Sequence, residues 1–367
     1  MSGPTELRKK QKSASAVTVG AFSSMMQRFF PDGSAQPKAL AVGVSGGPDS
    51  MALCYLLSHW AEQQKNPPEL YALTVDHGLR PESAQEAQKV QETVSGWAHV
   101  SHRTLVWHKE KAVASRVQEQ ARSARYGLMA SEMKARGIND LFLAHHKDDQ
   151  AETFLFRLAK GSGLDGLAGM ASQKIYKTGA GDEIRFCRPF LESVSKDDLI
   201  CTCVDNDIPF VDDISNKALK FARVRLRQSQ EILSAEGLTP GRLSRTAGRL
   251  ARARSALEEI SSKAYVDATL EKNTKQIVLT SSAVFSYPEE VVLRILLLAM
   301  AELKMEAEKD RADDTYASSY GPRLERVEKL CADLLKPNPF RTRTLGRVKF
   351  ERKDKRGIIV LSLEVQK

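Results

Sequence analysis

The chain has 367 residues, of which 42% are hydrophobic, and a formal charge of +9 at pH 7. This length indicates two domains with room for a small third. No apolar run approaches the ~20 residues that a membrane span needs, and five cysteines are too few for a disulfide framework in a chain this long. A membrane protein and a disulfide-rich secreted domain are therefore excluded.

The first 38 residues are basic and lack the apolar core of a signal peptide. We expect a disordered tail here, followed by a short helix over residues 19–30. These features and the cysteine content favour a cytoplasmic location. A mitochondrial presequence is the alternative that the composition leaves open.

Apolar runs alternate with helical patterns in the first half of the chain. Strands are expected over residues 39–44, 70–76, 103–108 and 141–145, and helices over residues 49–63, 81–97 and 115–136. Strands separated by helices of this length form parallel βαβ units that are covered on both faces. The sequence therefore predicts an α/β fold with a doubly wound parallel sheet.

The segment between the first strand and the first long helix is rich in glycine and serine. It consists of Ser45, Gly46, Gly47, Pro48, Asp49 and Ser50. Glycines let backbone N–H groups approach an oxyanion, proline suits the first turn of a helix, and the helix dipole favours negative charge. Asp49 would repel a bare phosphate, so its presence indicates that Mg²⁺ accompanies the ligand. The loop is predicted to bind a polyphosphate.

Polar residues also follow the second and fourth strands, as Asp76 with His77 and as residues 145–149. Because the carboxyl ends of neighbouring parallel strands converge, we expect these segments in one cleft. Asp149 and Glu152 share one helix face, which suits an ammonium group, although first-turn acids that complement the helix dipole give the same pattern. The histidines match no zinc spacing and are interpreted as residues of the cleft wall.

The rest of the chain carries further helical and strand patterns. They predict a helix over 149–160, a mobile glycine-rich loop over 161–169, an edge strand over 184–188, helices over 196–206, 240–273, 288–303 and 323–335, and strands over 343–350 and 358–365. We expect four segments: a tail with a short helix (1–37), a nucleotide-binding catalytic domain (38–235), a basic helical connector (236–273) and a small C-terminal α+β unit (274–367).

Positive charge is concentrated in residues 217–254, which contain ten Lys or Arg and two acids. Such a concentration favours an anionic partner larger than a nucleotide, and RNA is the leading candidate. Arg245, Arg249 and Arg252 share one face of the expected long helix, while apolar residues from Leu243 to Ile260 share another. A merely solvated helix face is the alternative interpretation.

Six sets of motifs resemble those of the bacterial tRNA(Ile)-lysidine synthetase family. They lie at residues 45–50, 76–83, 121–126, 144–153, 161–170 with 188–191, and 213–216 with 223–227. The first loop alone is typical of all N-type ATP pyrophosphatases, whereas the D-H-G-L-R and A-H-H-x-D-D-Q-A-E-T motifs are far more specific. The resemblance covers residues 38–230. One departure is Val224, where the family pattern has Asn, so one polar contact of that pattern is in question.

The resemblance implies an enzyme that uses ATP and Mg²⁺ to activate C2 of the wobble cytidine in a tRNA(Ile) with the anticodon CAU. Free L-lysine then attacks the adenylated tRNA, and pyrophosphate and AMP are released. The implied partners are therefore this tRNA and lysine, with no membrane.

The same resemblance distributes the candidate residues among the substrates. Those for ATP are residues 45–50, Asp76 and His77, and those for lysine are Asp149, Glu152 and either Arg122 or Arg125. The candidate catalytic residues are Asp49, Asp149, Arg223 and Arg227, with Asp49 also the candidate magnesium ligand. The tRNA is expected to contact Arg245, Arg249, Arg252 and the C-terminal unit.

Two other functions fit parts of the sequence. A PP-loop tRNA thiolase would use the same adenylation, but such enzymes typically need a cysteine persulfide or an iron–sulfur cluster held by C-x-x-C, and this chain has no C-x-x-C. A non-catalytic RNA-binding protein with an ATP-sensing fold would not require Asp49, Asp149 and Glu152 together. The sequence leaves the oligomeric state open, with a homodimer as one alternative.

Overall fold

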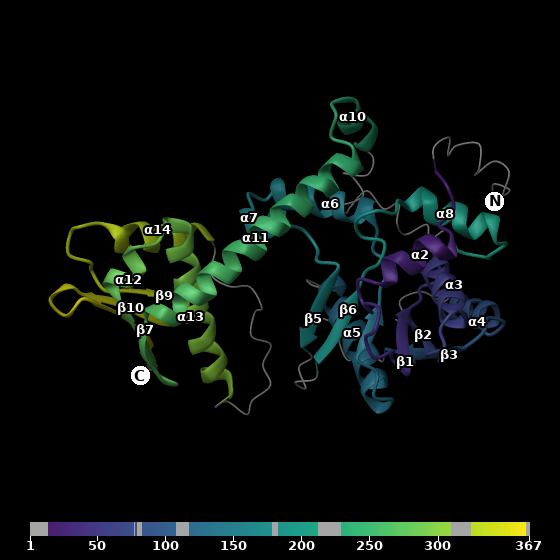
Figure 1. Ribbon diagram of the computed structural model, residues 1–367, viewed down its shortest axis with the longest axis horizontal. Helices are drawn as coiled ribbons and strands as arrows, with labels where there is room; N and C mark the ends of the chain where they lie inside the picture. Colours follow the sequence, from purple (N-terminus) through teal and green to yellow (C-terminus); the bar gives the residue numbers. More distant parts are fainter. Residues whose placement is uncertain are drawn as a thin grey trace. The chain divides into compact units, whose positions relative to one another are not determined.

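The computed structural model describes residues 14–76, 78, 83–107, 117–177, 183–211, 229–309 and 324–364. The chain divides into two compact units, residues 1–250 and 251–367. Each unit contains its own β-sheet, and Figure 1 shows the helices and strands coloured along the chain.

The first unit is built on a six-stranded sheet with the order β3-β2-β1-β4-β6-β5. Its strands are β1 (Ala39–Gly43), β2 (Glu69–Asp76), β3 (Val100–Val106), β4 (Asp140–Phe142), β5 (Gln173–Lys177) and β6 (Glu183–Cys187). All neighbours pair in parallel except β5, which is antiparallel to β6. The predicted doubly wound parallel sheet is confirmed.

The helices of this unit are α3 (Pro48–Glu62), α4 (Ser83–Val94), α5 (Val117–Ala135), α6 (Lys147–Leu158), α7 (Leu164–Leu167), α8 (Lys196–Asp205) and α10 (Gln230–Ala235). Helices pack on both faces of the sheet. Leu40 and Val42 lie in a core that contains residues of α3 and α8, whereas Ala41 between them lies in a separate core with Met129 and Met133 of α5. The alternation of β1 side chains thus places a hydrophobic core on each face.

Two predictions for this unit are wrong. The strand expected at the edge over 184–188 is internal, because β6 pairs with β4 on one side and with β5 on the other. The true edge is β5, whose two lysines and limited apolar content gave no strong signal. The glycine-rich stretch 161–169, expected as a mobile loop, contains α7 and is bonded to α6: Arg157 donates to the carbonyls of Gly166 and Gly169 at 2.7 and 3.1 Å.

The segment before β1 is part of the first core. Its helix α2 (Val19–Met26) ends earlier than the predicted residue 30, and it buries Phe22 and Met26 completely. The Val17 backbone N–H donates to Thr202 Oγ1 of α8 at 2.9 Å, and Arg28 pairs with Glu192 at 2.8 Å. Of the disordered tail expected before this helix, residues 1–13 lie outside the described residues, and the prediction is wrong for the remainder, since Val17 is buried and bonded to α8.

The second unit contains an antiparallel sheet with the order β7-β8-β11-β10-β9. Its elements are β7 (Thr269–Lys272), β8 (Gln276–Thr280), α12 (Ser281–Phe285), α13 (Glu289–Lys309), α14 (Leu324–Leu335), β9 (Arg343–Leu345), β10 (Val348–Lys353), the 3₁₀ turn η2 (Asp354–Arg356) and β11 (Ile358–Leu363). Leu279, Phe350 and Leu361 of this sheet share one core with residues of α13 and α14. The sequence predicted an α+β unit here, and the unit contains both helices and strands. The prediction missed β8 and α12.

The long helix α11 (Pro240–Ala268) begins in the first unit and ends in the second. It is shorter than the predicted 240–273, because Thr269 to Lys272 pair with β8 as strand β7. The strand predicted over 343–350 is two strands, β9 and β10. They are joined at Gly346 and Arg347, both with positive φ angles (58° and 68°), which make a tight turn.

No helix in the described part of the chain is long and apolar enough to cross a membrane.

Candidate active site at the carboxyl edge of the first sheet

The site lies where the order of the first sheet reverses. Strand β1 has β2 on one side and β4 on the other, so the connections after β1 and β4 leave the sheet in opposite directions. Open α/β sheets bind ligands at such a switch point, beyond the carboxyl ends of the strands. The glycine-rich loop follows β1 and residues 145–149 follow β4, so the sheet brings the two motifs to the same point.

The loop after β1 is held in a conformation that favours glycine. Gly46 has a φ of +83°, and a Cβ atom there would lie 3.1 Å from Val90 Cγ2. Ser50 closes the loop, because its hydroxyl accepts from the Ser45 N–H and donates to the Gly47 carbonyl, both at 3.1 Å. Gly47 is the N-cap of α3. The loop therefore presents the positive end of a 15-residue helix, as an anion site requires.

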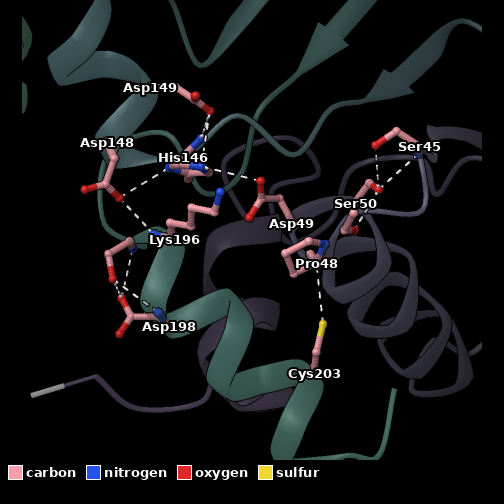
Figure 2. Close-up of polar contacts among 12 residues, drawn as sticks. Ser45, Pro48, Asp49, Ser50, His146, Asp148, Asp149, Lys196, Asp198 and Cys203 are labelled. Carbon is pink, nitrogen blue, oxygen red and sulfur yellow. Dashed lines mark hydrogen bonds and ion pairs between the residues drawn. The ribbon is translucent and has the colours of Figure 1, made fainter. Parts of the chain in front are cut away.

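Asp49 stands in the first turn of α3 and faces the segment after β4 (Figure 2). Its Oδ2 lies 3.7 Å from His146 Nε2. Its Oδ1 is buried, and among the described residues it has no hydrogen-bond partner. A buried carboxylate oxygen without a partner is costly, so this atom fits a cation ligand.

His146 connects Asp49 to the acids of α6 (Figure 2). Its side chain is only 3% exposed, with Nδ1 3.3 Å from Asp148 Oδ2 and Nε2 3.5 Å from Asp149 Oδ2. Its backbone N–H also donates to Asp149 Oδ2 at 3.1 Å. Burial by itself lowers the pKa of His146, but the carboxylates of Asp148, Asp49 and Asp149 outweigh it and raise the pKa to about 10. The imidazole is therefore protonated at neutral pH.

Sequence reasoning did not find this role for His146, which was interpreted as part of the cleft wall. The available signal was a histidine at the N-cap of a helix whose first turn contains two aspartates, Asp148 and Asp149. The spacing alone does not show that Asp49, almost a hundred positions away, completes the cluster.

Asp148 ties α6 to α8. Its Oδ2 accepts from the Lys196 backbone N–H at 2.8 Å. Burial raises the pKa of Asp148, but the contacts with His146 and the Lys196 N–H lower it by a larger amount. The pKa of Asp148 is therefore below its ordinary value. The start of α8 is itself fixed, because the Ser195 hydroxyl and N–H donate to Asp198 Oδ2 at 2.6 and 2.8 Å.

Glu152 lies one turn after Asp149 on α6 and is buried, with 7% of its surface exposed. Together with Asp148 it lines a small pocket whose other walls are apolar: Ala151, Leu155, Leu233, Leu238 and Leu243. The pocket has a free volume of only about 10 Å³, room for no more than one water molecule, so the described residues place carboxylates beside aliphatic side chains but form no preformed ligand cavity here.

Asp76 ends β2, the neighbour of β1. Its Oδ1 accepts from the Gly78 N–H at 2.9 Å and from the Ser83 hydroxyl at 2.5 Å, so it links the end of β2 to the first residue of α4. His77, Arg223 and Arg227 lie outside the described residues, as does the side chain of Arg122. Arg125 is an exposed residue of α5, and within the described residues it makes no ion pair with Asp149 or Glu152.

The predicted basic face of α11 is exposed at Arg245, Arg249 and Arg252. The opposite side of the helix is anchored, because Leu243 and Ala247 are buried in a cluster with Ala151 and Phe154 of α6. The expected apolar face does not extend along the whole helix, since Ile260 is 48% exposed.

Within the described residues, no group of three or more His, Cys, Asp and Glu side chains is arranged to hold a metal ion. All five cysteines are described; all are buried and none forms a disulfide.

The family described as the PP-loop domain matches residues 20–233. A tRNA(Ile)-lysidine synthase from Rhodopseudomonas palustris is 40% identical over 276 residues, which cover 75% of this chain and 77% of that protein. One from Methylobacterium sp. (strain 4-46) is 41% identical over 270 residues, 73% of this chain and 75% of that protein.

Among solved structures, a U34-tRNA thiolase from Methanococcus maripaludis with its [4Fe-4S] cluster has a TM-score of 0.50 and 16% identity. The match covers 64% of this chain and 80% of the thiolase. At this identity the likeness shows the fold alone.

Proposed function

The chain belongs to the tRNA(Ile)-lysidine synthase family, and on that premise we propose the reaction and the residues that perform it. The protein is a ligase that uses ATP to modify the wobble position of a tRNA. Its substrates are ATP, free L-lysine and a tRNA(Ile) with the anticodon CAU, and it acts in the cytoplasm.

The first step is adenylation of the tRNA. The cytidine O2 attacks the α-phosphate of ATP, a new O–P bond forms, the bond to the β-phosphate breaks, and pyrophosphate leaves with the electron pair. The loop after β1 and the N-terminus of α3 hold the phosphates. Asp49 is the residue that would hold Mg²⁺, which when bound neutralises charge on the phosphates, and its buried Oδ1 supports this assignment.

The second step joins lysine to the tRNA. A lysine amine attacks C2, the bond from C2 to the adenylated oxygen breaks, and AMP leaves with that oxygen. Asp149 and Glu152 hold the lysine ammonium, and a carboxylate in this position also accepts the proton that the amine loses. The position of the buried Glu152 beside leucine side chains supports this proposal, because leucines suit the aliphatic stem of lysine.

One observation carries the proposal. The His146 imidazole lies 3.7 Å from the carboxylate of Asp49, on the phosphate loop, and 3.5 Å from that of Asp149, at the proposed lysine site. The acids proposed for the two substrates thus contact the same imidazole nitrogen. The lysine amine can attack C2 of the adenylated cytidine only if both groups are held close together in one orientation, and neighbouring binding sites provide this.

The thiolase alternative has no support from the cysteines. Burial raises the pKa of the Cys54, Cys187 and Cys203 thiols to about 12, so they are neutral at physiological pH. A neutral thiol is a poor nucleophile and a poor metal ligand.

Incorporation of radiolabelled lysine tests the proposal. With ATP and an unmodified tRNA(Ile) of anticodon CAU, we expect label in the tRNA and one AMP per lysine. Elongator tRNA(Met), which has the same anticodon, is the control that should stay unlabelled. Pyrophosphate release without lysine incorporation would instead indicate another nucleophile, and no pyrophosphate release would indicate a binding protein.

A further inference from the structure

The carboxylates of Asp49, Asp148 and Asp149 around His146 form an acidic cluster. Lys196, the first residue of α8, lies beside this acidic cluster, and among the described residues its ammonium does not pair with it. Figure 2 shows its side chain extending from the start of α8 toward His146 and Asp49. Only its backbone N–H is engaged, by Asp148. Within the described residues the Lys196 ammonium forms no ion pair, although three carboxylates surround the neighbouring imidazole.

The position of Lys196 does not stabilise its own helix. A cation in the first turn is opposed by the helix dipole, which favours acids there, and Asp197 and Asp198 follow directly. The fixed end of α8 instead aims a long cationic side chain at the phosphate loop. An anion bound in the site would pair with the Lys196 ammonium and would also interact favourably with the positive end of the α8 dipole.

The charges of the site also require a further cation. Asp49, Asp148 and Asp149 carry negative charge, and the buried His146 is enclosed by them. A nucleoside triphosphate would add several more negative charges at the same edge of the sheet. The His146 imidazolium is already enclosed by carboxylates. Among the described residues, the Lys196 ammonium makes no ion pair, so it is available to the far phosphates.

We propose that Lys196 is a substrate-binding residue whose ammonium contacts the β- and γ-phosphates of ATP and then the departing pyrophosphate. A lysine suits this role as a mobile point charge on a long stem. When the bond between the α- and β-phosphates breaks, its electron pair goes to a β-phosphate oxygen, and the ammonium stabilises the charge that develops there. The role of Lys196 in stabilising the departing pyrophosphate rests on the proposed function, whereas its contact to the phosphates of bound ATP does not.

Substitution of the side chain tests the inference without disturbing Asp148, because Asp148 is held by the Lys196 backbone. In the full chain we would compare Lys196→Gln and Lys196→Arg with Lys174→Gln, which removes one exposed lysine from β5. Calorimetry with Mg²⁺ would give the Kd values of ATP and of AMP. Single-turnover assays with tRNA would give the rate of pyrophosphate release.

We expect Lys196→Gln to weaken ATP binding about tenfold or more, the usual effect of losing a hydrogen bond to a charged group. AMP, which lacks the β- and γ-phosphates, should bind within about twofold of its normal affinity. Pyrophosphate release should slow further at saturating ATP. Lys196→Arg should keep most of the ATP affinity, and Lys174→Gln should behave as wild type.

Three results would overturn the inference. They are an ATP affinity of Lys196→Gln equal to that of Lys174→Gln, equal losses of ATP and AMP affinity, and a Lys196→Gln protein that does not fold, because the side chain would then be structural. If the wild type releases pyrophosphate but joins no lysine, the proposed function fails, while the difference between ATP and AMP still decides the role of Lys196.

Discussion

Two charged regions of this protein differ in how their charges are held. At the carboxyl edge of the first sheet, Asp49, His146 and Asp149 are partly or fully buried, and each of the two carboxylates lies within 3.7 Å of the His146 imidazole. On α11, Arg245 and Arg249 are exposed. Buried charges in contact fix the positions of atoms, as chemistry requires, whereas exposed charges provide attraction that salt screens.

We propose that this difference separates two kinds of substrate contact. A small reactant must be held to a fraction of an ångström, so its contacts belong on side chains locked by packing. A tRNA offers many equivalent phosphates, so flexible exposed arginines suffice to position it. Variants at the sheet edge should therefore change turnover or lysine use, and variants on α11 should change tRNA affinity and its dependence on salt.

The largest effect is expected for Asp49→Ala. Loss of the proposed metal-linked carboxylate removes transition-state stabilisation of several kcal/mol, which is on the order of a thousandfold in rate. Single-turnover pyrophosphate release would measure this, with circular dichroism to show that the fold is intact. Near-normal pyrophosphate release by a folded variant would show that Asp49 does not take part in ATP cleavage. It would also contradict the expectation that variants at the sheet edge change turnover.

His146→Gln should destabilise the protein by about 3 kcal/mol at neutral pH, because it leaves carboxylates near each other without their cation. The folded pKa of about 10 lies above the unfolded value, so the stabilisation is complete below about pH 6.5 and is lost as the pH rises through 10. Urea unfolding at pH 6, 8 and 10 should therefore show that the difference in unfolding free energy between the wild type and the variant decreases as the pH rises. His59→Gln, at an exposed histidine paired with Glu62, is the matched control and should change stability little. A difference independent of pH would show that His146 contributes packing rather than charge.

Asp149→Asn and Glu152→Gln should each raise the KM for lysine by about thirtyfold, since each loses one charged contact to the ammonium. The KM for ATP should change far less. Steady-state kinetics with each substrate varied in turn would measure both constants. If both rose equally, the pair would belong to the ATP or metal site.

The smallest effect is expected for exchange of Arg245, Arg249 and Arg252 for glutamate. Affinity for tRNA should fall about tenfold at low salt, and the slope of log K against log salt should flatten by about two or three. Filter binding across a salt series measures this, with ATP affinity expected to stay unchanged. Lys263→Glu, farther along α11, is the control for a single charge reversal. Unchanged tRNA affinity in the triple variant would mean that this face is only solvated.

Much of the site was readable from local sequence. A strand, a tight glycine turn and a helix lie within some twenty residues around Ser45, so short-range rules predict the loop after β1. The convergence of the β1 and β4 connections followed from the topology of parallel sheets. By contrast, the contacts of His146 with Asp49 and of Lys196 with Asp148 join residues far apart in the sequence, and no periodicity encodes them.

The sequence by itself determined the alternation of strands and helices, the phosphate loop and the excess of positive charge, because these depend on local residue order and composition. Only the tertiary structure decided that β5 rather than β6 forms the edge, that α2 completes the first core and that α11 ends at Ala268. Each of these outcomes depends on a distant partner: β6 for β5, the core around α3 and α8 for α2, and β8 for the residues after α11. Pairing and burial of this kind are settled when the chain folds, which is why local patterns did not predict them.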